Sequence, residues 1–362
     1  MIPIVKPFIP PVEELIPALQ ETLYSGYIAE GEKVYEFENQ FSNFIRNPLS
    51  LSLNSGTAAL HLSLLLAGVG VGDEVISTVL TAEPTNVAIK LVGAKVVWAD
   101  VQANTGLVDP KSVREKISPR TKAIMLVHYA GMVCNMDEFI AISKEFNIPI
   151  IEDAAHALGA KYNGLPIGSH SDYTIFSLQA IKHMTTVDGG FLCVKSEENY
   201  KKGKLLRWFG LDKTKPRLEN DITIPGYKYH MNNVNATIGI VQMNHINNIL
   251  GKYIENGLYF DQNLKNITGV SLLEYNPNTS PSYWLYTMKV QNREGFIKKL
   301  AENGITASEL HLRNDRHSLF KESRTELPVF DQFYKEMVHL PCGWWLSNED
   351  KEKMIEIIKR GW

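Results

Sequence analysis

The chain has 362 residues and carries 37 Lys and Arg against 40 Asp and Glu, so its formal net charge is −3. This balance argues against a nucleic-acid-binding protein, because such a protein carries a basic excess or a basic stripe. Apolar residues make up 44% and charged residues 21% of the chain, which is ordinary for a globular protein and excludes wholesale disorder. The length exceeds one average domain, although large α/β domains reach about 250 residues.

The cysteines and the apolar stretches indicate the compartment. Cys134, Cys193 and Cys342 are scattered and form no CxxC pair, so we expect a reducing compartment, with no disulfide framework and no metal site. The first ten residues contain three prolines and no small-residue cleavage site, which argues against a signal peptide. Apolar stretches such as Leu60–Val71 are too short and too interrupted to span a bilayer. We therefore expect a cytoplasmic protein with no membrane and no nucleic-acid partner.

Strand-like and helix-like segments alternate from about residue 50 to residue 195. Helices between strands imply crossover connections and a mostly parallel sheet. The strands are nearly continuous in apolar residues, which is typical of a sheet covered by helices on both faces, so we expect an α/β fold. The expected helices are Thr57–Ala67, Asn86–Leu91 and Met136–Phe146, and the expected strands are Glu74–Val79, Lys95–Trp98, Thr121–His128, Pro149–Glu152 and Tyr173–Ser177.

After about residue 250 the pattern changes. Strands of a more alternating type are expected at Ser271–Glu274 and Tyr283–Val290, and helices at Arg293–Asn303 and Glu349–Lys359. This pattern predicts a smaller α+β unit. The chain has no internal repeat, no low-complexity tract and no long Gly/Ser linker, so we expect a packed hinge between the two units.

Two glycine-containing segments are candidates for phosphate binding. Gly68–Gly72 follows an expected helix and leads into a strand, whereas a dinucleotide loop has the opposite order, so we interpret it as a connection. Gly56 lies just before the helix expected from Thr57. Free N–H groups and the positive dipole end of a helix start form an anion site, and small residues allow close approach. Simple N-capping within Asn54–Thr57 is the alternative.

An acid and a lysine complete the candidate chemistry. Asp153 ends an apolar strand, where open α/β sheets bind their ligands. It is either a catalytic group or a cap for the next helix, and a nearby cationic ring nitrogen would favour the first. Lys182 follows an apolar stretch and lacks the solvated setting of the lysines at 195–204. A lysine in an apolar, electropositive setting has a lowered pKa and attacks carbonyl groups as an amine.

A phosphate cup, an acid for a pyridinium nitrogen and a Schiff-base lysine are the handles that pyridoxal 5′-phosphate (PLP) needs. In the order and spacing of these motifs the chain resembles the DegT/DnrJ/EryC1/StrS family of sugar aminotransferases, which has the aspartate aminotransferase fold (PLP fold type I). The resemblance covers nearly the whole chain. Its motifs are residues 25–31 (SGYIAEG), 37–38 (FE), 55–60 (SGTAAL), 152–156 (EDAAH), 176–190 and 226–232 (GYKYHMN).

The resemblance implies a large mostly parallel PLP-binding domain and a smaller C-terminal domain. We place them at residues 12–250 and 251–362, with residues 1–11 joining the second. It also implies a homodimer whose active sites lie at the subunit interface. Lys182 is implied as the catalytic Schiff-base lysine, which moves protons to and from the substrate carbon. Asp153 is implied as the catalytic acid that pairs with the pyridine N–H.

The remaining cofactor contacts are also implied by the resemblance. His156 stands where many members have Gln and is implied as a partner of the ring hydroxyl. Lys228 stands where many members have Asn; it could reach the partner subunit's phosphate as a point charge, or it is a solvated lysine near the interface. The phosphate contacts implied within one chain are Gly56, Thr57, Ala58 and Ser177.

Departures from the family pattern concern the substrate. Ala82 stands where members often have an aromatic near the cofactor, so it leaves space beside the ring. The stretch 309–317 replaces a shorter histidine-proline pattern that lines the substrate site. Within it, Arg313, Arg316 and His317 are expected to bind a nucleotide diphosphate, because guanidinium groups suit phosphate. A surface loop is the alternative.

His183, directly after the lysine, is expected to contact the substrate. Some family members have histidine in place of the lysine and are dehydratases, but here Lys182 holds that position, which favours transamination. We therefore expect the amino group of L-glutamate, which leaves as 2-oxoglutarate, to reach a nucleotide-linked keto-sugar. A 4-keto-6-deoxyhexose for surface-polysaccharide or related amino-sugar synthesis is favoured, by analogy with the family.

Three alternatives stay open beside this expectation. One is a PLP-dependent sugar dehydratase. Another is an aminotransferase for a 3-keto-sugar, a cyclitol ketone or another substrate without a nucleotide. The third, a PLP-fold sensor or regulator, is not favoured because no DNA-binding extension is visible in the sequence. The identity of the nucleotide is left open.

Overall fold

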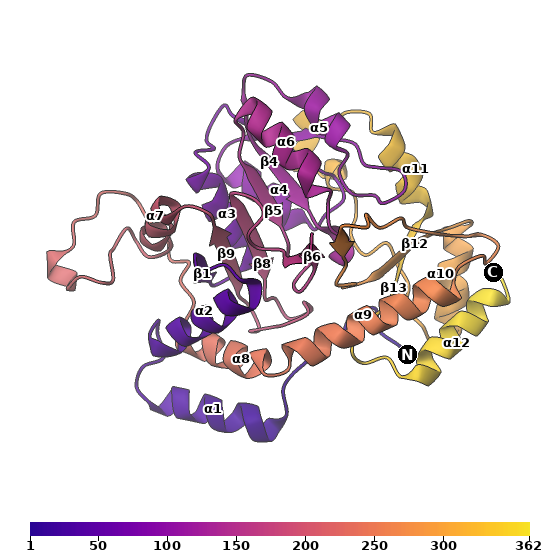
Figure 1. Cartoon of the computed structure of the whole chain (residues 1–362), viewed down its shortest axis with the longest axis horizontal. Helices are drawn as coiled ribbons and strands as arrows, with labels where there is room; N and C mark the ends of the chain where they lie inside the picture. The colour runs from indigo at the N-terminus through magenta and orange to yellow at the C-terminus, as the bar shows by residue number, and fades with distance from the viewer.

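The computed structural model describes residues 1–362 and is built around a seven-stranded sheet (Figure 1). The strand order is β1-β9-β8-β5-β4-β2-β3. Only β9 runs against its neighbours, so the expected mostly parallel sheet is confirmed. The strands are β1 (Ser50–Leu53), β2 (Glu74–Ser77), β3 (Lys95–Trp98), β4 (Thr121–Val127), β5 (Ile150–Asp153), β8 (Tyr173–Ser177) and β9 (Gly190–Val194).

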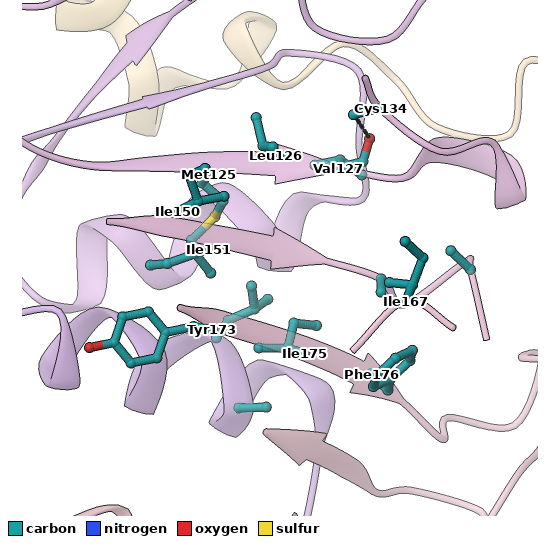
Figure 2. Packing of buried hydrophobic residues seen from close by; sticks show 14 of the residues in the cluster. Met125, Leu126, Val127, Cys134, Ile150, Ile151, Ile167, Tyr173, Ile175 and Phe176 are labelled. Atoms are coloured by element: carbon teal, nitrogen blue, oxygen red, sulfur yellow. Dashed lines mark hydrogen bonds between the residues drawn. The ribbon is translucent and has the colours of Figure 1, made fainter. Parts of the chain in front are cut away.

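The central strands are buried because their residues are apolar on both faces. The parallel register of β4 and β5 places Ile124 opposite Ile150 and Met125 opposite Ile151. Figure 2 shows apolar side chains along the neighbouring strands β4, β5 and β8, such as Leu126, Ile151 and Ile175. Apolar burial of this kind contributes roughly 25 cal/mol per Å² of surface removed from water, and it makes the sheet a rigid base for the site at its edge.

Helices cover the sheet and connect its strands. α3 lies against β8, β9 and α4 and is buried on nearly every side, which explains why its sequence is apolar all round. α8 packs against both α1 and α2, below the sheet in Figure 1. The helices of this part are α1 (Val12–Tyr24), α2 (Glu32–Ile45), α3 (Gly56–Leu66), α4 (Glu83–Leu91), α5 (Pro110–Lys116), α6 (Met136–Phe146), α7 (Glu197–Arg207), α8 (Asn233–Met243) and α9 (Ile246–Asn263).

A second, antiparallel sheet lies in the C-terminal part, at the right in Figure 1. It has its own apolar core, and Ile2 forms a bridge to Ile305 beside it. A third sheet has three strands of two residues each, β6 (Lys161–Tyr162), β7 (Leu165–Pro166) and β11 (Thr279–Ser280). The other elements of the C-terminal part are β10 (Val270–Leu272), β12 (Tyr286–Val290), β13 (Met337–Leu340), α10 (Arg293–Glu302), α11 (Pro328–Glu336) and α12 (Asn348–Lys359).

The boundary between the two parts is not a simple cut in the sequence. α9 continues through residue 250, with Leu250 in the larger core and Phe260 in the smaller one. Phe330 of α11 packs back into the larger core. A division at residue 250 therefore stays a prediction. None of the helices combines the length and the apolar character that crossing a bilayer requires.

Candidate active site

The residues expected to bind the cofactor meet at one edge of the large sheet, where its parallel strands end. Asp153 ends β5, and Ser177 ends β8 opposite Gly190 of β9. Lys182 lies in the turns that follow β8. The site therefore lies outside the carboxyl ends of the strands, where open α/β sheets bind their ligands.

The start of α3 forms a candidate anion site against Ser177. A Cβ on Gly56 would lie 2.9 Å from the Cβ of Ser177, so only glycine fits this close approach. The Ser55 hydroxyl accepts the Ala58 N–H at 3.0 Å, and the N-capping alternative therefore accounts for Ala58. The N–H groups of Gly56 and Thr57 have no backbone partner, and they remain available to a phosphate together with the Ser177 hydroxyl.

Asp153 is a buried carboxylate, 4% exposed, without an ion-pair partner. Its oxygens accept the Thr85 hydroxyl at 2.7 Å and the Ala155 N–H at 3.0 Å. Burial raises the pKa of Asp153, while the hydrogen bonds from Thr85 and Ala155 lower it. A buried carboxylate is stabilised by a cation. The protonated ring nitrogen of PLP is such a cation, so the residues present fit this group.

Lys182 is a half-buried amine close to Asp153 and to the indole of Trp284. Burial lowers the pKa of Lys182 to about 8, and the charge of Asp153 acts in the opposite direction. Its Nζ lies 4.2 Å from the centroid of the Trp284 ring. About one tenth of this lysine is therefore unprotonated at pH 7, far more than for an ordinary lysine, and the unprotonated amine is the form that attacks a carbonyl.

His156 is buried beside the lysine as a neutral ring. Burial lowers the pKa of His156 well below its ordinary value, and the charge of Lys182 lowers it further. Its Nδ1 accepts the Ala130 N–H at 3.4 Å, so the proton of the neutral ring is on Nε2. The ring stacks on Trp284 with centroids 3.9 Å apart, and the parallel ring of His311 lies 5.7 Å away. His156 therefore offers one N–H donor to the site.

In the loop 309–317 the charge of Arg313 is neutralised by neighbouring carboxylates. The Arg313 guanidinium forms a two-bonded ion pair with Asp315, at 2.6 Å for each bond, and a further bond to Asp331. These hydrogen bonds, that of Asp315 first, raise the pKa of Arg313. Arg316 is exposed, and His317 has its Nε2 3.8 Å from Glu83. The structure therefore does not present Arg313 as a free phosphate ligand, in contrast to the expectation, and only the exposed Arg316 has an unpaired guanidinium.

His183 is in the interior and not on a surface open to substrate. It is 1% exposed, its Nε2 hydrogen-bonds the Ser282 carbonyl at 3.1 Å, and its ring packs against Tyr253. Burial lowers the pKa of His183 to about 3, so the ring is neutral. His183 therefore packs in the interior next to Lys182, and this position does not support the expected substrate contact.

Lys228 lies next to the anion site of its own chain by its backbone. Its carbonyl accepts Asn54 Nδ2 at 3.1 Å, and the Asn54 N–H bonds the neighbouring Tyr229 carbonyl at 2.7 Å. The side chain is exposed and makes no ion pair. A reach to a partner subunit stays a prediction.

Two contacts of the site were not expected from the sequence. Thr85 and Trp284 are distant in sequence from the residues they touch, and neither has a local motif that would single it out. No group of three or more His, Cys, Asp or Glu side chains is arranged to hold a metal ion.

A strand-end acid, an anion site at a helix start and a lysine with a lowered pKa define a PLP enzyme with the aspartate aminotransferase-like fold. The chain belongs to the DegT/DnrJ/EryC1/StrS aminotransferase family, whose model matches residues 11–359. It is a PLP-dependent aminotransferase, which confirms the expected class, fold and cofactor.

Three similar proteins span almost the whole chain. The sugar aminotransferase CalS13 from Micromonospora echinospora is 34% identical with a TM-score of 0.96, and 100% of each chain is covered. Spr1654 from Streptococcus pneumoniae, solved in its PLP form, is 31% identical with a TM-score of 0.91 and covers 99% of this chain and 98% of its own. The UDP-4-amino-4-deoxy-L-arabinose–oxoglutarate aminotransferase of Shewanella sediminis is 32% identical over 99% of this chain and 97% of its own.

Proposed function

We propose that the protein transfers the amino group of L-glutamate to a nucleotide-linked keto-sugar, in the synthesis of amino sugars for surface polysaccharides or related products. The observation that carries the proposal is the half-buried amine of Lys182 beside the buried, unpaired carboxylate of Asp153. The names of the similar proteins support the substrate class, because one is a sugar aminotransferase and another acts with oxoglutarate on a UDP-linked amino sugar.

The residues of the site have separate tasks in this reaction. PLP, when bound, supplies an electron-accepting ring that stabilises negative charge on the reacting carbon. Asp153 would bind the ring N–H and keep it protonated, and the His156 Nε2–H would donate to the ring hydroxyl oxygen. The N–H groups of Gly56 and Thr57 bind the phosphate with Ser177, as these free donors suggest.

Lys182 is the proton carrier of the proposed mechanism. As an amine with a pKa of about 8 it takes a proton from the α-carbon of the amino donor. In the second half of the reaction it delivers a proton to the sugar carbon that receives the nitrogen. The neutral rings of His156 and His311 near this amine have lowered pKa values, so they are weaker bases than the lysine and do not compete with it for the proton.

The substrate side rests on fewer groups. Arg316, the unpaired guanidinium of the loop, and His317 are proposed to meet the diphosphate. A ketone at C4 of a 6-deoxyhexose is favoured by analogy with the family, and a ketone at C3 is the nearest alternative.

A homodimer with the active sites at its interface belongs to the same proposal. α1 exposes apolar side chains that a monomer would leave in water, among them Val12 (68% exposed) and Tyr24 (86% exposed). The segment between α7 and α8 extends away from the body of the chain in Figure 1, and at its base Lys228 bridges Trp208 by its backbone and has an exposed side chain. This segment would bring Lys228 to the partner's cofactor phosphate. A cytoplasmic location is proposed with it.

The test is a product analysis with the PLP-loaded protein, L-glutamate and a panel of UDP-, dTDP- and GDP-linked 3-keto- and 4-keto-sugars. We expect a product in which the ketone has become an amine, with equimolar 2-oxoglutarate, and no turnover by Lys182→Ala. A product that has lost water identifies a dehydratase. Turnover only with a free cyclitol ketone identifies the second alternative. A complete lack of reaction with any amino acid despite bound PLP supports a sensor.

A further inference from the structure

We propose that Trp284 is a positioning residue that holds the side chain of Lys182 whenever this lysine is not attached to the cofactor. In transamination the lysine must leave the cofactor in each half of the cycle and still act on the substrate carbon. The inference rests on the role proposed for Lys182. The proposed position of the free Lys182 amine is next to the aromatic face of Trp284.

The indole is held rigidly against the lysine. Trp284 is 0% exposed, and its Nε1–H donates to the carbonyl of Ile181, the residue directly before Lys182, at 2.9 Å. The same ring stacks on His156. One tryptophan therefore touches the backbone of the lysine turn, the lysine amine and the neighbouring histidine. A shift of the indole would move all three.

The backbone around Trp284 is equally constrained. A Cβ on Gly131 would lie 2.8 Å from the backbone nitrogen of Trp284, so the turn Tyr129–Gly131 packs directly on the backbone of this segment. The Ser282 N–H bonds the Gly131 carbonyl at 3.0 Å, and Tyr283 adopts a positive φ of 48°. A non-glycine residue with positive φ is strained, and such strain persists where the surrounding packing demands it. The fold therefore fixes the position of the indole.

The charges around Lys182 explain why an aromatic face is useful there. Asp153 favours the protonated form, whereas burial disfavours it. The other titratable side chains near the amine are His156, His183 and His311, all with lowered pKa values and all neutral, so none of them adds a charge beside the ammonium. An indole face attracts an ammonium group without competing for its proton. Trp284 thus keeps a protonated lysine in place but does not trap it in an ion pair.

The experiment uses the full-length protein loaded with pyridoxamine phosphate, in which Lys182 is free. Trace acylation with acetic anhydride from pH 6 to pH 10, read by mass spectrometry of the peptide with this lysine, measures its pKa. The variants are Trp284→Leu, which removes the aromatic face, and Trp284→Phe, which keeps it. Trp344→Leu is the matched control, because Trp344 also lies over a lysine, Lys6, in another part of the chain.

Loss of the aromatic face should lower the pKa of Lys182 by about 0.5–1 unit in Trp284→Leu, with values near wild type in Trp284→Phe and Trp344→Leu. The half-reaction with L-glutamate should slow about three- to tenfold in Trp284→Leu at an unchanged KM, with a larger isotope effect from α-deuterated glutamate. An unchanged or raised pKa in Trp284→Leu overturns the proposal. Equal losses of rate in the Leu and Phe variants do the same, because they indicate packing alone.

Thermal unfolding of each loaded variant shows whether it is folded. If Trp284→Leu is not folded, a pKa of Lys182 in Trp284→Phe that is lowered by about 0.5–1 unit from wild type overturns the proposal, because the aromatic face is still present in that variant. A separate experiment tests the proposed function. Borohydride reduction of the PLP-loaded protein followed by peptide mapping identifies the lysine that carries the cofactor. If another lysine carries it, the role of Lys182 is wrong whatever the Trp284 variants do.

Discussion

The turn that carries Lys182 and the loop that carries Arg313 are both cationic in sequence, and the structure treats them in opposite ways. Lys182 lies among neutral histidines and a tryptophan, and its only nearby carboxylate, Asp153, forms no ion pair with it. Arg313 is bonded to both Asp315 and Asp331. The amine of Lys182 has a lowered pKa and stays reactive, whereas the Arg313 guanidinium is ion-paired and stabilises its own loop.

This difference teaches that the availability of a charge, not its presence, marks a functional cation. A positive side chain with saturated partners stabilises structure, and one that is left short of partners in a buried place is free for chemistry. The variants that follow test the contrast between the two regions, beginning with the reactive one.

The largest effect is expected for Lys182→Ala. Turnover should fall by about 10⁴-fold or more, because both the cofactor attachment and the proton carrier are lost. The absorbance of the lysine-bound cofactor should disappear, and added PLP should bind reversibly. Lys201→Ala, in an exposed lysine of α7, is the control and should leave both properties unchanged. Normal transamination by Lys182→Ala would remove the lysine from the mechanism.

Asp153→Asn should have the next largest effect. The amide keeps the size of the side chain and can still accept the Thr85 hydroxyl, but it removes the charge that keeps the ring nitrogen protonated. We expect kcat to fall by about 10²–10³-fold while the protein stays folded. Thr85→Val, which removes only the supporting hydrogen bond, should cost less. A fully active Asp153→Asn variant contradicts the assigned role.

The pH dependence should report the lysine. Because burial lowers the pKa of Lys182 to about 8, the fraction of free amine increases about tenfold per pH unit below this value and levels off above it. The half-reaction with L-glutamate, in which the free amine takes the α-proton, should follow this curve in stopped-flow absorbance. A rate that is flat between pH 6 and pH 9 shows that the lysine amine is not needed in that step.

Gly56→Ala should weaken cofactor binding. The added methyl group would lie 2.9 Å from the Cβ of Ser177 and would push the start of α3 away from it. We expect the Kd for PLP, measured by absorbance titration, to rise about tenfold, which corresponds to roughly 1.4 kcal/mol. Gly70→Ala, where the added methyl group meets open space, is the control. Equal affinities in the two variants would argue against an anion site at this helix start.

The smallest effect on activity is expected for a substitution of Arg313. This substitution should lower the stability of the protein and leave its activity nearly unchanged. Arg313→Gln leaves the buried Asp315 without its partner and should lower the free energy of unfolding by about 1–3 kcal/mol, measured in urea, with little change in kcat/KM. Arg316→Gln should do the reverse, raising the KM for the keto-sugar without changing stability. If the Arg313 variant binds substrate poorly while remaining fully stable, the contrast between the two regions fails.

Much of the cofactor end of the sheet could be predicted from the sequence. Asp153, Ser177 and Gly56 each belong to a short motif at a strand end or a helix start, and the backbone itself supplies the chemistry there. Thr85 and Trp284 could not be predicted, because each reaches the site from a distant segment and has no motif of its own. The substrate role expected of His183 was not supported, since its ring packs against Tyr253 and its Nε2 hydrogen-bonds the Ser282 carbonyl.

The elements that the sequence missed have a similar explanation. β9 begins at Gly190, the second of two consecutive glycines, and pairs antiparallel between β1 and β8, so its place depends on partners far along the chain. The end of the larger core is likewise hidden, because α9 runs through both cores without a break. Patterns within a short window contain no information on such pairings.

The sequence by itself determined the alternation of apolar strands and helices, the motifs at the strand ends and therefore the family. A net charge of −3 from 37 basic and 40 acidic residues also argues against a nucleic-acid face, which stays a prediction. The tertiary structure alone decided which of those charges are free, because burial and partner distance are set by segments far apart in the chain. Asp315 and Asp331 bind Arg313, whereas Trp284 and three neutral histidines surround Lys182.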